Sequence, residues 1–282
     1  MNINIVNIGL AQQFDRKSDI VYGLFHAFKT LGHTPTISHN SFTVDKLNLI
    51  IGSAILAGSN QACENLFENK IPFAIYEVEN FNGTTINYRK NFNIEAYKYL
   101  LTTAEFIVTP YLHNVPKLIE VVNSSKVSYA KWGFHESMQN PNITRNCQYD
   151  SDACFFGLVK GDRVYKKQIL TKERPGSVKF IDENNPFTIR DYAVSQSRYG
   201  LSLSYGAADD FVNPFRLYYM SANGVPVLAD HDKDDDNYLQ LCDCSDFQTL
   251  LQKISEPTPK KIKEIIENAK SVQLVDELRE LL

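Results

Sequence analysis

The sequence predicts an α/β protein made of two Rossmann-like domains, each built on a parallel sheet. Short apolar runs alternate with helical segments through the first 139 residues, and this alternation is typical of parallel sheets. Residues 140–150 interrupt the pattern with a polar, proline-containing segment, NPNITRNCQYD. A second alternation follows. We therefore expect a first domain at 1–139, a linker at 140–150 and a second domain at 151–258.

In the first domain, each apolar run has the length of a strand and is followed by a helical segment or a turn. The helix expected at 19–31 ends at Gly32, a typical helix stop. The loop at 9–18 contains Gly9 but lacks the G-x-G-x-x-G pattern of dinucleotide-binding turns. The expected strands are 3–8, 36–39, 47–51, 73–76, 106–109 and 127–129, and further helices are expected at 62–69, 94–102 and 115–123.

The second domain repeats the alternation around one central stretch, residues 201–230. Residues 201–205 resemble the end of a buried strand. Asn213 and Pro214 then provide an N-cap and a first-turn proline for a helix, and Gly224 provides its stop. The other expected elements are strands at 153–156, 178–181 and 225–229, helices at 165–170, 188–195 and 247–254, and a long helix at 259–282 that packs back on the first domain.

The composition is that of an ordinary globular protein. Of 282 residues, 43% are hydrophobic and 22% are charged, and the formal net charge is −4. No apolar run reaches the roughly 20 residues of a membrane helix, and the start MNINIVNIGL lacks the features of a secretory signal. Five scattered cysteines fit a reduced compartment, and Cys242 and Cys244 have no second ligand pair that would suggest zinc. We expect a cytoplasmic monomer with no metal-ligating residues of its own and no membrane partner.

Basic residues and glycines gather at two places in the second domain. Directly after its first strand, Gly157 and Gly161 permit close backbone approach, and Lys160, Arg163, Lys166 and Lys167 offer cations for phosphate oxygens. The alternative is an ordinary solvated helix start. Arg216 lies in the first turn of the central helix, where its charge opposes the helix dipole unless an anion binds nearby. The alternative is a surface or ion-paired arginine.

Polar side chains around Arg216 can exchange hydrogen bonds with the hydroxyl groups of a ligand. They are Asp209, Asp210, Asn213 and Tyr219. Both cationic segments follow strands of the same parallel sheet, and open α/β sheets bind ligands at the carboxyl ends of their strands. The sequence therefore predicts a diphosphate site in the second domain.

Candidates for contact with a second substrate lie in and near the first domain. Glu77 and Glu79 directly follow the expected strand at 73–76. A carboxylate in a partly desolvated cleft can act as a general base, and a solvated loop acid is the alternative reading of both. Trp132 and His135 precede the expected linker, and the tryptophan is either a core residue or a platform for a sugar or base. We expect ligands to bind between the two domains.

Three segments together carry a resemblance to a known family. They are the opening strand MNINIVNIGL, the basic segment Gly161-x-Arg163, and a helix start with Asn213 and Arg216 followed by the apolar strand VPVLAD, which ends in an acid. Their order resembles that of GT-B glycosyltransferases, and more closely that of the DNA glucosyltransferases of T-even bacteriophages. The resemblance extends over most of the chain. It implies a GT-B fold, with two Rossmann-like domains facing across a cleft and a C-terminal helix that crosses back.

The resemblance also implies an activity. This would be inverting transfer of a sugar from UDP-glucose to hydroxymethylcytosine, or to its glucosylated form, in phage duplex DNA, with Mg²⁺ or Mn²⁺ as an optional cofactor. It places Lys160, Arg163 and Arg216 on the donor diphosphate and gives Glu77 the role of the base. Tyr219 is a departure, because the family has a glutamate there for the ribose hydroxyls. The donor sugar therefore stays open between glucose and a pentose.

The overall charge argues against a DNA substrate, because surfaces that bind duplexes are basic and the pI is about 5.9. However, residues 156–179 contain seven Lys or Arg and only two acids, which is compatible with a locally basic face. Two alternatives remain. One is a GT-B transferase acting on a surface polysaccharide or a protein, for which the spacing of Arg216 and Gly224 is also typical. The other is a catalytically silent binding protein of the same fold.

Overall fold

The computed structural model describes residues 1–9, 18–86, 93–143, 149–182, 185–206, 211–231, 233–234, 236–256 and 262–281. The chain divides into two compact units. Unit 1 consists of Met1–Trp132 together with Leu274–Leu282, and unit 2 consists of Gly133–Gln273. Each unit contains one sheet whose described strands are all parallel, so the predicted pair of Rossmann-like α/β domains is confirmed.

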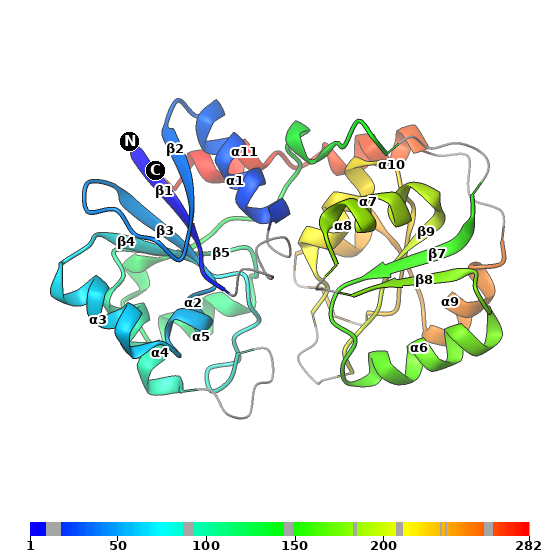
Figure 1. The fold of residues 1–282 in the computed structure, drawn as a ribbon, viewed down its shortest axis with the longest axis horizontal. Coiled ribbons are helices and arrows are strands. Elements are labelled where there is room, and N and C mark those ends of the chain that lie inside the picture. The colour runs from blue at the N-terminus through cyan, green and yellow to red at the C-terminus, as the bar shows by residue number, and fades with distance from the viewer. Residues whose placement is uncertain are drawn as a thin grey trace. The chain divides into compact units, whose positions relative to one another are not determined.

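The sheet of unit 1 has six strands in the order β2-β1-β3-β4-β5-β6 (Figure 1). Its central strands are apolar runs, LNLII in β3 and FAIY in β4, and almost all of these residues are buried. Continuous apolar runs are typical of parallel strands covered on both faces. The strands are β1 (Asn2–Asn7), β2 (Thr34–His39), β3 (Leu47–Ile51), β4 (Phe73–Tyr76), β5 (Ile107–Thr109) and β6 (Val127–Tyr129).

Helices from both ends of the chain pack on this sheet. The first helix, α1, buries Val21 and Leu24 and is followed by Gly32, whose φ of 82° suits a helix stop. Helix α11 lies beside α1 (Figure 1) and buries Leu274 and Leu278, so a distant segment completes the core of unit 1. The helices are α1 (Ser18–Thr30), α2 (Ser53–Leu56), α3 (Asn60–Glu68), α4 (Ile94–Thr103), α5 (Asn114–Ile119) and α11 (Leu274–Arg279).

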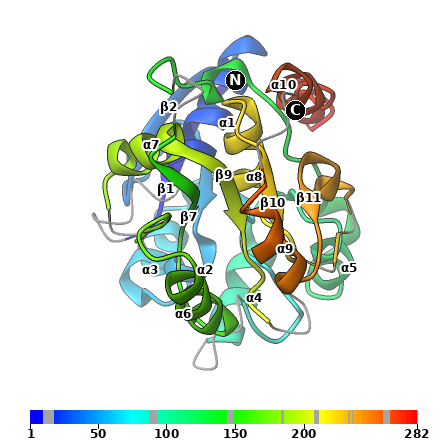
Figure 2. The same ribbon diagram turned by 90° about the vertical axis from the view of Figure 1, so that its right-hand side faces the viewer.

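The sheet of unit 2 has five strands in the order β11-β10-β9-β7-β8, and Figure 2 shows β10 between β9 and β11. The strands are β7 (Ser151–Phe156), β8 (Val178–Ile181), β9 (Ser197–Ser202), β10 (Val227–Ala229) and β11 (Asp243–Cys244). The helices are α6 (Asp162–Glu173), α7 (Phe187–Gln196), α8 (Pro214–Ala222), α9 (Phe247–Lys253) and α10 (Ile262–Ala269). In the part of the chain that the structure describes, no helix has both the length and the apolar character needed to cross a membrane.

Helix α8 has the ends that the sequence predicts. The side chain of Asn213 accepts a hydrogen bond from the N–H of Arg216 at 3.0 Å, and Pro214 occupies the first turn. At the other end, the N–H groups of Gly224 and Val225 bond back to carbonyls of the last turn, at 3.0 Å each, and Gly224 has a φ of 68°. The predicted N-cap and helix stop are therefore confirmed.

The strand expected at 201–205 is placed differently. It is β9, which begins at Ser197 and ends at Ser202. The residues that follow leave the sheet because α6 binds them: Tyr205 accepts a hydrogen bond from the N–H of Asp162 at 3.1 Å, and Gly206 turns the chain with a φ of 84°.

The single long helix expected at 259–282 is wrong, because this region contains two helices, α10 in unit 2 and α11 in unit 1. Between them, the carbonyl of Val272 accepts a hydrogen bond from the N–H of Phe134 at 2.7 Å. The segment therefore pairs with an extended part of the chain instead of continuing as a helix.

The start of the expected linker is bound within unit 2. The N–H of Asn140 donates to Oδ1 of Asn223 at 2.7 Å, and its side chain donates to Oδ2 of Asp191 at the same distance. Asn140 therefore binds the start of the expected linker to α7 and to the end of α8. The division between the units falls earlier in the chain, between Trp132 and Gly133.

Helix α8 approaches its sheet very closely at Gly200 in β9. A Cβ atom at this position would lie 2.0 Å from Sδ and 2.8 Å from Cε of Met220. Met220 is 0% exposed, so its side chain has no open space to move into. Glycine is required here because of packing, and the separation of helix and sheet depends on it.

We expect Gly200→Ala to lower the free energy of unfolding by about 1 to 3 kcal/mol, the usual cost of overpacking a core. Urea denaturation measures this loss. The double variant Gly200→Ala/Met220→Ala should lose less stability than the sum of the two single variants, because the new methyl group occupies space that Met220 vacates. A Gly200→Ala protein as stable as the wild type would contradict the close approach.

Candidate functional site

The carboxyl edge of the unit 2 sheet brings together the segments that follow β7, β9 and β10. Gly157 follows β7, Leu203–Gly206 follow β9, and Asp230 follows β10. The starts of α6 and α8 lie at the same edge, since each helix follows one of these segments in a parallel β/α arrangement. Ligands of open parallel sheets bind at this edge.

Arg216 is the central cation of this edge. It lies in the first turn of α8 and is only 8% exposed. Its guanidinium carbon lies 4.6 Å from the ring centroid of Phe155 and 5.5 Å from that of Phe156. Both aromatic faces attract the cation, and they hold it beside the positive end of the helix dipole. The guanidinium cation and the N-terminus of α8 therefore both contribute positive potential at the start of this helix.

Gly157 makes this position of Arg216 possible. The φ of Gly157 is 124°, a conformation that other residues rarely adopt. A Cβ atom there would lie 2.7 Å from Nη2 of Arg216. The structure thus brings together two residues that the sequence nominated separately, and it shows why the first of them is glycine.

A second arginine, which the sequence analysis missed, lies on the same aromatic surface. The guanidinium carbon of Arg190 is 4.1 Å from the ring centroid of Tyr219 and 5.5 Å from that of Phe156. Arg190 also forms an ion pair with Asp191 at 2.9 Å. Neither residue follows a strand or matches a motif, so no sequence signal distinguished them from other charged residues of a helix.

The hydroxyl of Tyr219 donates to Oδ1 of Asp191. Asp191 also accepts hydrogen bonds from Arg190 and from Asn140, at 2.9 and 2.7 Å. Tyr219 is 4% exposed. Within unit 2 the hydroxyl of Tyr219 therefore links α8 to α7. The sequence analysis had instead expected this hydroxyl to bind the hydroxyl groups of a ligand.

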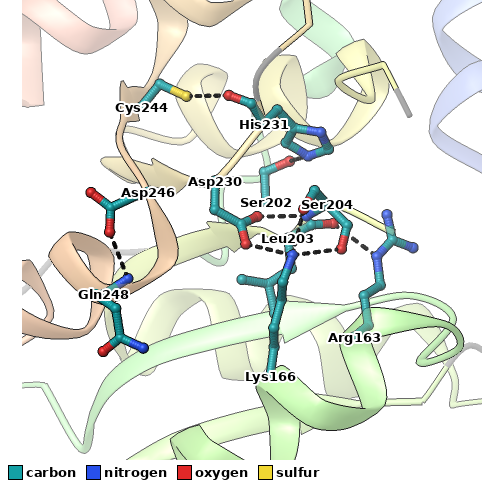
Figure 3. Close-up of polar contacts among 10 residues, drawn as sticks. All are labelled: Arg163, Lys166, Ser202, Leu203, Ser204, Asp230, His231, Cys244, Asp246 and Gln248. Atoms are coloured by element: carbon teal, nitrogen blue, oxygen red, sulfur yellow. Dashed lines mark hydrogen bonds and ion pairs between the residues drawn. The ribbon is translucent and has the colours of Figure 1, made fainter. Parts of the chain in front are cut away.

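The basic residues of the segment after β7 divide into two kinds, of which Figure 3 shows Arg163 and Lys166. Lys160 is exposed. Arg163 donates from Nε to the carbonyl of Leu203 at 2.8 Å and from Nη1 to that of Leu158 at 3.2 Å. Lys166 forms an ion pair with Asp230 at 2.6 Å. Of the three, Lys160 alone presents an exposed cation, whereas Arg163 and Lys166 bind the protein's own loops.

In unit 1, Glu77 directly follows β4 and is 0% exposed. Its Oε2 accepts hydrogen bonds from the hydroxyl of Ser53 and from that of Tyr97, the latter at 2.5 Å. Its Oε1 accepts from the N–H of Glu79 at 2.8 Å. Because Glu77 is fully buried, an external hydroxyl group can reach this carboxylate only if neighbouring atoms move.

Burial raises the pKa of the Glu77 carboxyl, and the hydrogen bonds from Ser53 and Tyr97 offset only part of that rise. Glu79 is half-buried, and its carbonyl accepts a hydrogen bond from the side chain of Asn114 at 2.9 Å. Its backbone is therefore held at both N–H and C=O. The structure thus places one fully buried and one half-buried acid at the end of β4.

Two further candidates have structural roles in the described chain. Trp132 is 1% exposed and packs edge-on against Tyr76, with the ring centroids 6.3 Å apart. His135 is 6% exposed, and its Nδ1 accepts a hydrogen bond from the N–H of Ser137 at 3.1 Å, which caps a short 3₁₀ helix at Glu136–Met138. The first is a core residue and the second an N-cap.

The described residues do not fit a metal site held by the protein. Among them, no group of three or more His, Cys, Asp or Glu side chains could bind an ion. Asp209 and Asp210, which the sequence analysis placed near Arg216, lie outside the described residues.

Comparison of the sequence with protein-family models and with curated proteins gives no match, whereas the fold matches solved structures over nearly the whole chain. HepE from Anabaena in complex with UDP-glucose has a TM-score of 0.56 at 12% identity, covering 99% of this chain and 98% of that one. A glycosyltransferase involved in avilamycin A biosynthesis has a TM-score of 0.56 at 9% identity, covering 99% and 96%. The UDP-GlcNAc 2-epimerase from Neisseria meningitidis, bound to UDP-GlcNAc, has a TM-score of 0.53 at 13% identity, covering 100% and 99%.

Together with the two parallel sheets, these similarities show that the chain has the GT-B fold. At such low identity they show the fold alone. Because both a glycosyltransferase and an epimerase are among the similar structures, the chemistry has to be inferred from the site.

The raised pKa of Glu77 predicts how stability changes with pH. Above its ordinary pKa of 4.5, the folded protein binds the proton of Glu77 more tightly than the unfolded chain does. Wild-type stability should therefore fall relative to that of Glu77→Gln as the pH rises from about 4.5 through the folded-state pKa. Urea denaturation of both proteins between about pH 4.5 and 8 measures this difference.

The control for this series is Glu95→Gln, which removes a carboxylate whose side chain is 79% exposed. Its stability relative to the wild type should vary much less with pH. A constant difference between wild type and Glu77→Gln across the whole range would contradict the assigned direction of the pKa.

Proposed function

We propose that the protein transfers a sugar from a nucleotide-sugar donor, and that the carboxyl edge of the unit 2 sheet binds the diphosphate of that donor. One observation carries the proposal: the cation of Arg216 is held beside the N-terminus of α8, against the backbone of Gly157. Helix N-termini and arginines both bind phosphate oxygens. Gly157, Lys160, Asn213 and Arg216 form the proposed donor site, while Arg163 and Tyr219 support it through Leu203 and Asp191.

The same arrangement suits the chemistry of sugar transfer. An acceptor hydroxyl oxygen forms a bond to the anomeric carbon, and the bond from that carbon to the diphosphate oxygen breaks. The diphosphate leaves with the electron pair, so negative charge grows on it in the transition state. Fixed cations and helix dipoles stabilise such charge without reorganising. Arg216 and the start of α8 supply this stabilisation.

The proton of the acceptor hydroxyl requires a base. We assign it to the acids after β4, where the resemblance selects Glu77. Glu79 is the second candidate, because it is half-buried and Ser53 and Tyr97 donate to Glu77 instead. Separate Glu77→Gln and Glu79→Gln variants distinguish the two, because the variant that lacks the base should lose turnover and keep donor affinity.

The proposal names UDP-glucose as the donor and hydroxymethylcytosine, or its glucosylated form, in duplex DNA as the acceptor. The donor is supported by the UDP-sugars bound in two similar structures. The acceptor is supported by the resemblance to phage DNA glucosyltransferases and by the basic residues in 156–179.

The decisive test is transfer from labelled UDP-glucose to three duplexes, which carry cytosine, hydroxymethylcytosine or glucosylated hydroxymethylcytosine. We expect label in one of the two modified duplexes, with the product nucleoside identified by mass. Donor turnover without any acceptor would instead indicate hydrolysis or epimerisation. UDP binding without turnover would favour another donor or acceptor, or a silent binding protein.

Arg216→Ala should weaken UDP binding by about 1.5 to 3 kcal/mol, the usual strength of a hydrogen bond to a charged group. Gly157→Ala should weaken it as well, because the added Cβ displaces the guanidinium. Isothermal titration calorimetry measures both effects. Arg279→Ala, which removes an arginine with 65% of its side chain exposed, is the control. Unchanged affinity in Arg216→Ala would remove Arg216 from the site.

A further inference from the structure

Lys166 and Asp230 form an enclosed ion pair beneath the proposed donor site. Nζ of Lys166 lies 2.6 Å from Oδ2 of Asp230, and the two side chains are 10% and 3% exposed. Removing two charges from water is costly unless further hydrogen bonds satisfy them. The partners that supply these bonds therefore indicate what the pair holds in place.

Those further bonds converge on Ser204 (Figure 3). Nζ of Lys166 donates to the carbonyl of Ser204 at 3.0 Å and also to its hydroxyl. The N–H of Ser204 donates to Oδ1 of Asp230 at 2.6 Å. The ion pair thus binds the N–H, the C=O and the hydroxyl of one residue, and it fixes the backbone of the segment after β9.

Residues of helix α6 contact the same segment. Arg163 donates to the carbonyl of Leu203 at 2.8 Å, and the N–H of Asp162 donates to the carbonyl of Tyr205 at 3.1 Å. A Cβ atom on Gly206 would lie 2.1 Å from Oδ2 of Asp162. Leu203, Ser204 and Tyr205 therefore each accept a hydrogen bond from α6, and Gly206 lies directly against Asp162.

We propose that Lys166 is a positioning residue for the donor site, which acts by fixing residues 203–206 and without touching the donor. The assignment rests on the proposed function. Residues 203–206 connect β9 with the part of the chain that leads to Asn213 and Arg216 at the start of α8. A segment at the edge of a binding site that is ordered in advance does not lose conformational entropy when the ligand binds, so the ion pair should increase donor affinity.

If Lys166 and Asp230 only stabilised the fold, their loss would leave the UDP affinity of the folded protein unchanged. A double variant distinguishes this role from the positioning role. Lys166→Met/Asp230→Leu removes both charges, and replacing a buried pair by apolar residues is often neutral for stability. Because the variant also loses the hydrogen bonds to Ser204, we expect it to fold with a melting temperature somewhat below that of the wild type. We also expect amide hydrogen exchange of residues 203–206 to accelerate and UDP affinity, measured by calorimetry, to fall about tenfold, equivalent to about 1.4 kcal/mol.

The control is Lys172→Met, which removes an exposed lysine from the same helix and should change neither exchange nor affinity. Ser204→Ala keeps the ion pair and loses only the hydroxyl contact. It should therefore show smaller increases in amide exchange and smaller losses of UDP affinity, and it tests the proposal even if the double variant does not fold.

Wild-type UDP affinity in a folded double variant would overturn the positioning role, and so would unchanged exchange of residues 203–206. A wild-type protein that does not bind UDP would contradict the proposed donor site. In that case the exchange measurement alone decides whether Lys166 fixes the segment.

Discussion

The close packing of α8 on its sheet is the constraint on which unit 2 depends. All nine residues of this helix are buried, and two positions without side chains permit its approach. Gly200 leaves room for Met220 in the last turn of the helix, and Gly157 leaves room for Arg216 at its start. The same contact that builds the core therefore also places a buried cation at the carboxyl edge of the sheet. A change in this packing should therefore alter both the stability of unit 2 and the position of Arg216.

The basic residues of unit 2 show that burial decides what a charge can do. Lys160 is exposed, so its cation is available to an incoming anion. Arg163 and Lys166 lie a few residues further along, yet their hydrogen bonds end on carbonyls and a carboxylate of the protein. Arg190 is paired with Asp191, and its guanidinium also covers an aromatic ring. Of these four residues, Lys160 thus offers an exposed cation, whereas Arg163, Lys166 and Arg190 bind other groups of the protein.

The sequence predicted those features that depend on local chemistry. Alternating apolar runs located the strands, and Asn213 and Gly224 located the ends of α8, because capping needs only the neighbouring backbone. Features that depend on distant partners were missed. The break between α10 and α11 comes from a hydrogen bond to Phe134, and the enclosure of Glu77 comes from Ser53 and Tyr97. No spacing rule connects such residues, since only the folded chain brings them together.

The return of α11 to unit 1 has a consequence for biosynthesis. Unit 2 is an insertion in unit 1, because residues 133–273 separate the two parts of unit 1. Leu278 and Leu281 line a small void with Tyr76 and Phe28. These apolar residues of the first sheet and of α1 therefore stay uncovered until α11 has been synthesised. Domains usually fold in their order of synthesis. Here the unit that is translated first completes its core last. A nascent chain stalled before residue 274 would expose the apolar residues that α11 normally covers, and chaperones bind such surfaces.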